Sequence, residues 1–301
     1  MRFTIGPSAG FVKTQEQAEE CFRSPSNVIV LGSYTREERP GNPGNTYSHT
    51  PWGSLNSLGL PNQGIYALKS WLPDFLKKAV KAGKSVRVSL AAFSPSEYAK
   101  EAARLVTYGV RSIELNLGCP NVWGEDGQKP IASLNLPLMR GVLDQTRQAV
   151  GRDYPLAVKI SPLVDPTLFA PVWKMFLEFR IATVVTMNTF PNALGFDESG
   201  KPLISVGEGL AGFAGSGVKL IALGQVAQFN AQRMAAPRAT PKGPRIRIDG
   251  VGGIADARDV LDMRRAGADG VLIGTAFGER GPSIFGDIMT NLPDDVLSEM
   301  S

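Results

Sequence analysis

The sequence predicts a (β/α)8 TIM barrel, an α/β fold, and three observations support this prediction. Eight short, apolar, β-rich runs recur along the 301 residues, amphipathic stretches of helical length separate most of them, and no low-complexity linker divides the chain. Strands that alternate with helices imply right-handed parallel crossovers, and eight such units close most simply into a barrel of about 250 residues plus insertions. A doubly wound open sheet is the alternative. We therefore expect one barrel domain over residues 1–301.

The apolar runs and the amphipathic stretches define the expected elements. The expected strands are Val28–Leu31, Ser54–Asn56, Val86–Leu90, Ile113–Leu117, Leu156–Ile160, Thr183–Met187, Ile246–Ile248 and Gly270–Ile273. The expected helices are Glu97–Tyr108, Pro137–Val150, Thr167–Phe179, Lys219–Met234 and Ala255–Ala266. Two long polar or glycine-rich segments, 36–51 and 190–217, follow strands and have the length typical of binding loops or lids.

Composition narrows the class of protein. The net charge of +4 is mild and scattered, so neither nucleic acid nor a membrane is predicted as a partner. Two cysteines cannot form a disulfide framework, and their contexts suggest separate thiols in a reducing compartment. The chain opens without a signal-peptide pattern and contains no apolar run near the roughly twenty residues that span a bilayer. We expect a soluble, cytoplasmic protein.

Polar residues gather where the expected strands end. Because the loops at the carboxyl ends of barrel strands share one face, we expect these side chains to converge on one pocket. A pocket rich in side-chain amides suits a flat heterocycle with alternating hydrogen-bond donors and acceptors. The residues concerned are Asn56, Asn116, Cys119, Asn121, Lys159, Asn188 and Thr189.

Glycines follow the last two expected strands. Gly252-Gly253 and Gly274-Thr275 each lead into a turn or helix, where the backbone can approach a ligand closely and offer unpaired amide protons. Loops after strands seven and eight commonly bind phosphate in this fold. The pattern therefore predicts a phosphorylated planar cofactor, and flavin mononucleotide (FMN) is the natural candidate.

Lys159 and Cys119 are the candidate reactive groups. Lys159 lies in an apolar strand, where a charge is costly unless it meets an anion or an electron-rich ring. Over a flavin it would stabilise negative charge, whereas the structural alternative pairs it with an interior acid. Cys119 is a candidate base or nucleophile, although a single cysteine near a strand end is more often a packing residue.

The remaining cysteine and the single histidine are expected to have no catalytic role. Cys21 is expected to pack in a helix. His49, the only histidine, is expected to be a solvated loop residue, so no His-based metal site and no Ser-His-Asp triad is predicted.

Several motifs together resemble the dihydroorotate dehydrogenase family. The segments ELNLGCPN, AVKISP, VVTMNT, IDGVGGI and VLIGTAFGERGP occur in the family's order, and ERPGNP and GSLNSLGLPN resemble its class 1A branch. The resemblance spans about residues 6–292, nearly the whole chain. It implies a barrel that binds FMN, is usually a homodimer, and removes a proton from a dihydropyrimidine while hydride passes to the flavin.

The resemblance also implies roles for individual residues. Cys119 matches the catalytic base, and Lys159 matches the flavin-contacting lysine. The positions that match substrate contacts are Asn56, Leu58, Gly59, Leu60, Asn116, Asn121, Asn188 and Thr189, of which Leu58, Gly59 and Leu60 lie at the substrate carboxylate. The positions that match flavin or phosphate contacts are Ala9, Gly10, Gly32, Ser33, Asn56, Asn116, Lys159, Gly212, Gly252, Gly253, Gly274 and Thr275.

The chain departs from the family pattern mainly at Gly32. The family has Lys-Ser-x-Thr here, and its lysine lies between flavin and substrate carboxylate, whereas this chain has Gly32-Ser33-Tyr34-Thr35. The glycine is expected to open space above the ring, and Arg36 or Arg39 could reach in. Smaller departures are an insertion within 123–129, in the loop expected to cover Cys119, and the segment 213–215.

Three hypotheses follow. The first is a class 1A-like dihydroorotate dehydrogenase of pyrimidine biosynthesis that tolerates Gly32, with fumarate as a candidate acceptor. The second is a related FMN oxidoreductase for a different cyclic substrate, since the anchoring lysine is absent. The third is a non-catalytic FMN-binding barrel, which the presence of Cys119, Lys159 and the asparagines disfavours. The electron acceptor is either a small molecule or a partner protein.

Overall fold

The computed structural model describes residues 2–124, 127–235 and 245–300. Its centre is an eight-stranded parallel sheet in the order β1-β14-β13-β10-β9-β6-β5-β2. These strands are β1 (Thr4–Pro7), β2 (Val28–Tyr34), β5 (Ser85–Leu90), β6 (Ile113–Asn116), β9 (Leu156–Lys159), β10 (Thr183–Val185), β13 (Arg247–Val251) and β14 (Gly270–Ile273). The amide of Asn27 donates to the Ile5 carbonyl at 3.1 Å, so β2 lies beside β1 and the sheet is a nearly closed barrel.

The barrel confirms the predicted fold class. Every residue of β2, β6, β9 and β14 is buried, as expected for parallel strands whose two faces are both covered. Seven of the expected strands match barrel strands in position. Their ends shift by a few residues, because the hydrogen-bond ladder ends where polar loops begin.

One expected barrel strand is wrong. Ser54–Asn56 belongs to β4 (Gly53–Asn56), which pairs antiparallel with its neighbours and lies outside the barrel ladder. The barrel strand that replaces it is β1 (Thr4–Pro7). It was not predicted because Gly6 and Pro7 interrupt any apolar run. Its pairing with β14 joins the two ends of the chain, a long-range contact that local propensity does not report.

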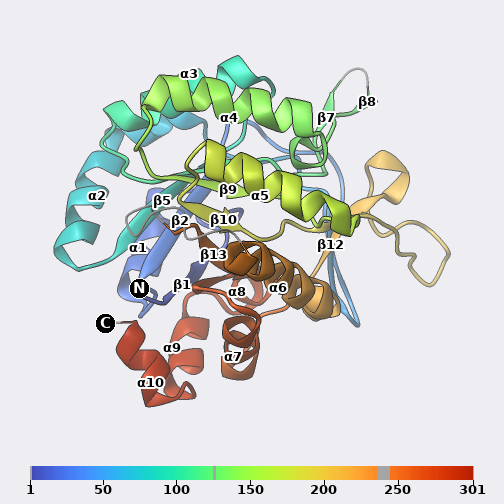
Figure 1. Cartoon of the computed structure of the whole chain (residues 1–301). Coiled ribbons are helices and arrows are strands. Elements are labelled where there is room, and N and C mark those ends of the chain that lie inside the picture. Colours follow the sequence, from blue (N-terminus) through green and yellow to red (C-terminus); the bar gives the residue numbers. More distant parts are fainter. Residues whose placement is uncertain (1, 125–126, 236–244, 301) are drawn as a thin grey trace.

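Helices cover the outside of the barrel (Figure 1). The expected helices are present within a few residues at their ends. The α-helices are α1 (Gln15–Arg23), α2 (Leu72–Lys81), α3 (Pro95–Thr107), α4 (Leu136–Val150), α5 (Phe169–Glu178), α6 (Lys219–Ala235), α7 (Ala257–Ala266), α8 (Thr275–Arg280), α9 (Ser283–Thr290) and α10 (Asp294–Glu299). Short 3-10 turns lie at η1 (Ile65–Ser70), η2 (Ala132–Leu134), η3 (Pro166–Leu168), η4 (Gly207–Gly209) and η5 (Ser216–Val218). Thr14 and Asp256 begin α1 and α7 with capping boxes.

The two long segments expected as loops contain strands. Segment 36–51 contributes β3 (Tyr47–Thr50), and segment 190–217 contributes β11 (Phe190–Ala193) and β12 (Ala211–Ala214). With β4 they form an antiparallel sheet in the order β11-β12-β4-β3. The prediction of plain loops was wrong because β11 and β12 pair with each other within segment 190–217, and β12 and β3 both pair with β4. The pairing of β12 with β4 joins segments far apart in the chain, which local pattern does not report.

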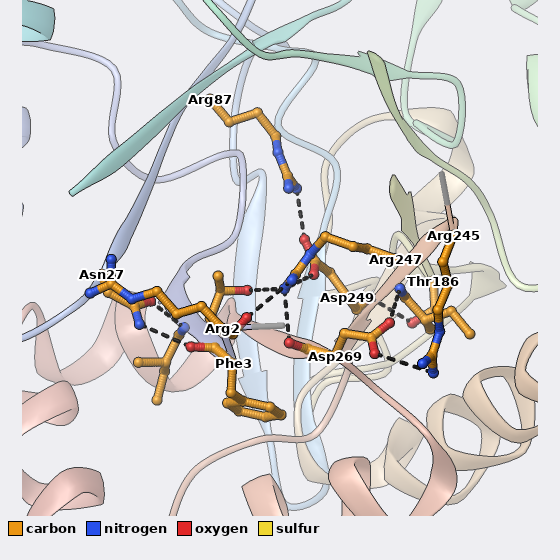
Figure 2. A network of polar contacts seen from close by, with 12 residues as sticks. Arg2, Phe3, Asn27, Arg87, Thr186, Arg245, Arg247, Asp249 and Asp269 are labelled. Carbon is orange, nitrogen blue, oxygen red and sulfur yellow. Dashed lines mark hydrogen bonds and ion pairs between the residues drawn. The ribbon is translucent and has the colours of Figure 1, made fainter. Parts of the chain in front are cut away.

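The amino-terminal ends of the strands are joined by a network of polar contacts (Figure 2). Arg87 of β5 donates to Asp249 of β13 at 2.9 Å and lies 3.6 Å from Glu114 of β6, and all three side chains are buried. Arg247 lies 3.6 Å from Asp249 and donates to the Asp269 carbonyl at 2.8 Å. We call Arg87, Glu114, Arg247 and Asp249 the floor of the barrel.

Both chain ends meet beside this floor. The Phe3 amide donates to the Glu299 carbonyl at 2.9 Å, and the Arg2 guanidinium donates to the Met300 carbonyl at 2.6 Å. The two termini accordingly lie side by side in Figure 1. The opposite end of the barrel, at the carboxyl ends of the strands, is thereby left free of the termini.

Candidate active site

A cavity of about 410 Å³ lies at the carboxyl ends of the barrel strands, partly covered by residues of the antiparallel sheet. Most residues that the sequence singled out line this one cavity. They are Ala9, Gly10, Ser33, Asn56, Leu58, Gly59, Leu60, Asn116, Cys119, Asn121, Lys159, Asn188, Thr189, Gly252, Gly253, Gly274 and Thr275. The expected convergence follows from the parallel register, which places Asn116 directly beside Lys159 at the ends of β6 and β9.

The four asparagines form two hydrogen-bonded pairs. Asn121 Nδ2 donates to the Asn56 carbonyl at 2.7 Å and to Asn56 Oδ1 at 3.2 Å. Asn188 Nδ2 donates to Asn116 Oδ1 at 3.2 Å, and Asn116 Nδ2 donates to Ser33 Oγ at 2.9 Å. Each amide is therefore fixed in orientation by its neighbours, so that its remaining donors and acceptors are preorganised toward a polar ring.

The thiol of Cys119 follows β6 and is half-buried. Burial raises its pKa, and the backbone amide of Asn121 and the cations Lys159, Lys13 and Arg39 oppose that rise. A buried thiol surrounded by cations is a weak acid whose thiolate is nonetheless stabilised in place. This arrangement suits a group that accepts one proton from a bound ligand.

Lys159 ends β9 with its ammonium in the cavity. Nζ donates to Ser8 Oγ at 3.0 Å, and burial lowers its pKa while Glu114 and Cys119 act in the opposite direction. Among the described residues no carboxylate lies within ion-pair distance of this ammonium. The structural alternative, a lysine paired with an interior acid, therefore does not hold, and the charge remains available to a ligand.

Residues Leu58, Gly59 and Leu60 present a row of free amides. Their three carbonyls are occupied by the Asn42 amide, the Arg39 guanidinium and the Asn62 side chain, at 2.9, 3.2 and 2.9 Å. In the described part of the chain, none of their three N–H groups has a hydrogen-bond partner. Gly59 and Leu60 have φ of +72° and +61°. Successive amides that face one way form a concave site for an anion.

Two further rows of free amides lie at the glycine loops. The N–H groups of residues 252–254, after β13, and of residues 274–276, after β14, likewise find no partner within the described residues. Both loops line the same cavity. Six free amide donors at two loops of one cavity form a site suited to a phosphate group.

Gly32 and Gly212 are not among the residues that line the cavity, and their cofactor contacts stay a prediction. Gly32 has a φ of +105°, and a Cβ there would lie 2.5 Å from the Ser89 carbonyl oxygen. The expected open space at Gly32 is therefore filled by backbone. A Cβ at Gly212 would lie 2.0 Å from Thr189 Oγ1, so this glycine lies behind the cavity wall and lets Thr189 pack.

The other departures from the family pattern fall around the rim. Segment 123–129 contains the short strands β7 (Trp123–Gly124) and β8 (Gly127–Gln128), and residues 125–126 lie outside the described residues. Gln128 donates to the carbonyl of Pro120, which ties this hairpin to the residue after Cys119. Residues 213–215 line the cavity wall beside β12.

Sequence reasoning missed several residues of the cavity. Lys13 and Phe11 line it from the loop after β1. They were missed because β1 was not recognised as a strand. His49 lies in β3 and, although exposed as expected, also lines the cavity, where Nδ1 lies 3.4 Å from Glu279 of α8. Of the two predicted arginines, Arg36 is exposed beside Glu37, and Arg39 is engaged by Gly59, so neither lines the cavity. No local sequence pattern indicated that Lys13 and His49 would line the cavity.

The fold and the cavity define a barrel protein with a ligand site at the carboxyl ends of its strands. The dihydroorotate dehydrogenase family model matches residues 2–296. Dihydroorotate dehydrogenase (fumarate) of Saccharomyces mikatae is 32% identical over 283 residues, covering 93% of this chain and 85% of that protein. The enzyme of the same name from Saccharomyces cerevisiae is 31% identical over 283 residues with the same coverage. The chain therefore belongs to the dihydroorotate dehydrogenase family.

A solved structure supports the fold independently. A crystal structure of DHODH from Eimeria tenella, in complex with ferulenol, superposes with a TM-score of 0.78 at 17% identity, covering 98% of this chain and 81% of that one. At this identity the likeness supports the barrel fold alone. Within the described part of this chain, no helix combines the length and apolar character needed to cross a bilayer.

Proposed function

We propose that this protein is an FMN-dependent dihydroorotate dehydrogenase of pyrimidine biosynthesis, an oxidoreductase acting on a CH–CH group. The carrying observation is one cavity that joins a thiol, an unpaired lysine and four oriented asparagines to two rows of free amides. The names of the relatives favour dihydroorotate over another cyclic substrate and fumarate as the acceptor.

The described residues fit FMN. The amides of 252–254 and 274–276 would hold its phosphate, and Lys159 would face its ring, where a cation favours negative charge. A Cβ at Gly10 would meet no atom within 4 Å, so this glycine leaves room for a ring beside the backbone. When bound, FMN supplies the acceptor for a hydride.

The residues of this chain divide the remaining work. Cys119, as thiolate, would take the proton from one ring carbon of dihydroorotate while hydride leaves the neighbouring carbon, so that a C=C bond forms and orotate results. The paired asparagines would hold the ring amides, which fixes the two C–H bonds relative to the thiol and the flavin. The amides of Leu58, Gly59 and Leu60 would bind the carboxylate.

Two further properties belong to this proposal. The family resemblance supports a homodimer and a cytoplasmic location. Small-molecule substrate and acceptor are sufficient for the reaction. A partner protein as electron acceptor has no observation in its favour.

An anaerobic titration of the oxidised, FMN-loaded protein with dihydroorotate tests the function. We expect the flavin absorbance band to bleach at micromolar substrate and to return when fumarate is added. Protein that retains FMN but shows no bleaching would contradict the proposed substrate. Bleaching without recovery on fumarate would retain the substrate and reject the acceptor.

A further inference from the structure

Lys13 is a half-buried lysine in the cavity wall whose charge is uncompensated. Within the described part of the chain, no hydrogen bond or ion pair engages its ammonium. Burying a cation without a partner is costly, so such a group usually meets an anionic ligand. The same loop carries Ser8, which accepts a hydrogen bond from Lys159. Lys13 takes no part in that hydrogen bond.

The backbone of Lys13 is held firmly in place. The Gly10 amide donates to the Gly32 carbonyl at 2.6 Å, and the Gly32 amide donates to the Val12 carbonyl at 2.8 Å. The Tyr34 hydroxyl donates to the Lys13 carbonyl at 2.8 Å. These hydrogen bonds attach the loop to β2 beside Gly32, a residue without a side chain. Lys13 therefore lies close in space to Gly32, the position at which the family pattern has its lysine.

Lys13 and Cys119 line the same cavity, and each affects the pKa of the other. Burial lowers the Lys13 pKa to about 8, and Cys119 opposes that change. Lys13 and Arg39 both lower the pKa of Cys119, and Arg39 binds the carbonyl of Gly59. Lys13 lines the same cavity as Cys119 and the free amides of Leu58–Leu60.

We propose that Lys13 binds the carboxylate of the substrate together with the backbone amides of Leu58–Leu60. The proposal rests on the proposed function and names the cation that selects an acid over the uncharged ring. Arg39 does not line the cavity; its Nε donates to the Gly59 carbonyl and its guanidinium lies over the Phe93 ring. The oriented amides would supply direction, and Lys13 would supply the charge.

Binding of orotate and uracil to the FMN-loaded protein tests this assignment. Both ligands have the same ring type, but only orotate carries a carboxylate, and the perturbed flavin absorbance reports binding without turnover. We expect Lys13→Met to weaken orotate binding roughly tenfold to a hundredfold, the range of a charge-assisted hydrogen bond, and to leave uracil binding unchanged. Lys13→Arg should recover most of the loss, since it restores the charge.

Lys81→Met is the matched control, because it removes the same charge from an exposed position in α2 outside the cavity lining. It should bind orotate like the unmodified protein. Equal orotate affinity in Lys13→Met and unmodified protein would overturn the assignment, and so would loss of FMN in both Lys13 variants. If the unmodified, FMN-loaded protein binds no orotate and is not reduced by dihydroorotate, the proposed function itself fails.

Discussion

Buried charges are compensated at the floor of the barrel but not at its mouth, the cavity at the carboxyl ends of the strands. At the floor, Arg87 lies 2.9 Å from Asp249 and 3.6 Å from Glu114, and Arg247 adds a second cation 3.6 Å from Asp249. At the mouth, Lys13 and Lys159 meet no carboxylate at such distances among the residues described. Charges that are already compensated stabilise the fold, whereas uncompensated charges are prepared for a ligand.

Neutral groups join the two regions. Ser89 donates to Glu114 at 3.1 Å, Ser89 and Ser33 share a hydrogen bond of 2.9 Å, and Asn116 donates to Ser33 at 2.9 Å. This chain of contacts runs from the floor acid to a cavity amide. The floor therefore orients part of the site without placing an acid next to the ligand, which would cancel the charge of the mouth.

The largest expected effect is at Cys119. Cys119→Ala should slow flavin reduction by dihydroorotate roughly 10²- to 10⁴-fold, because the proton acceptor is lost while the phosphate cradle is untouched. Stopped-flow absorbance measures the rate, and the flavin released on denaturation measures FMN content. Cys21→Ala is the matched control, since Cys21 is buried in α1, where burial raises its pKa to about 12. A reduction rate unchanged in Cys119→Ala would remove this thiol from the mechanism.

The floor should respond in stability. Burial alone would lower the pKa of Arg87, but Asp249 and Glu114 outweigh it and hold that pKa above its usual value. Arg87→Met removes the cation beside Glu114 and leaves Asp249 with Arg247 alone, and we expect the free energy of unfolding to fall by about 3–5 kcal/mol. Urea denaturation measures this. Arg140→Met, which breaks the exposed pair with Glu178, should cost far less. Equal losses in the two variants would remove the distinction between paired interior charge and surface charge.

The smallest expected effect is a pH dependence of the mouth. The Lys13 pKa of about 8 means that its charge is present at neutral pH and lost as pH rises through that value. Orotate affinity should then fall by up to about tenfold from pH 7 to pH 9. The ionisable groups near Lys13 are Cys119 and Tyr34, and Tyr47, His49, Lys159 and Glu279 also line the cavity.

Lys13→Arg separates these contributions, because arginine stays charged throughout that range. Its orotate affinity should be nearly independent of pH. Flavin reduction should move in the opposite direction and quicken with rising pH, since burial raises the pKa of the Cys119 thiol and more thiolate forms. A pH dependence of affinity that is the same in Lys13→Arg would assign it to another group.

Residues at strand ends could be predicted well, and residues on unrecognised pairings could not. Cys119, Lys159 and the four asparagines were found because each follows an apolar run whose direction is known in a parallel barrel. At Gly32 the sequence shows a missing side chain, whereas only the structure shows the Ser89 carbonyl beside it. Lys13 was missed because β1 pairs with β14, near the other end of the chain.

The sequence by itself determined the barrel, the family and most of the candidate residues that line the cavity, since periodic apolar runs and local motifs encode them directly. Only the tertiary structure decided which charges are compensated. Whether a lysine meets an acid depends on side chains contributed by strands and loops far apart in the chain. For this reason the two basic residues have different roles. Arg87 forms a structural ion pair with Asp249, whereas Lys13 is a proposed ligand contact.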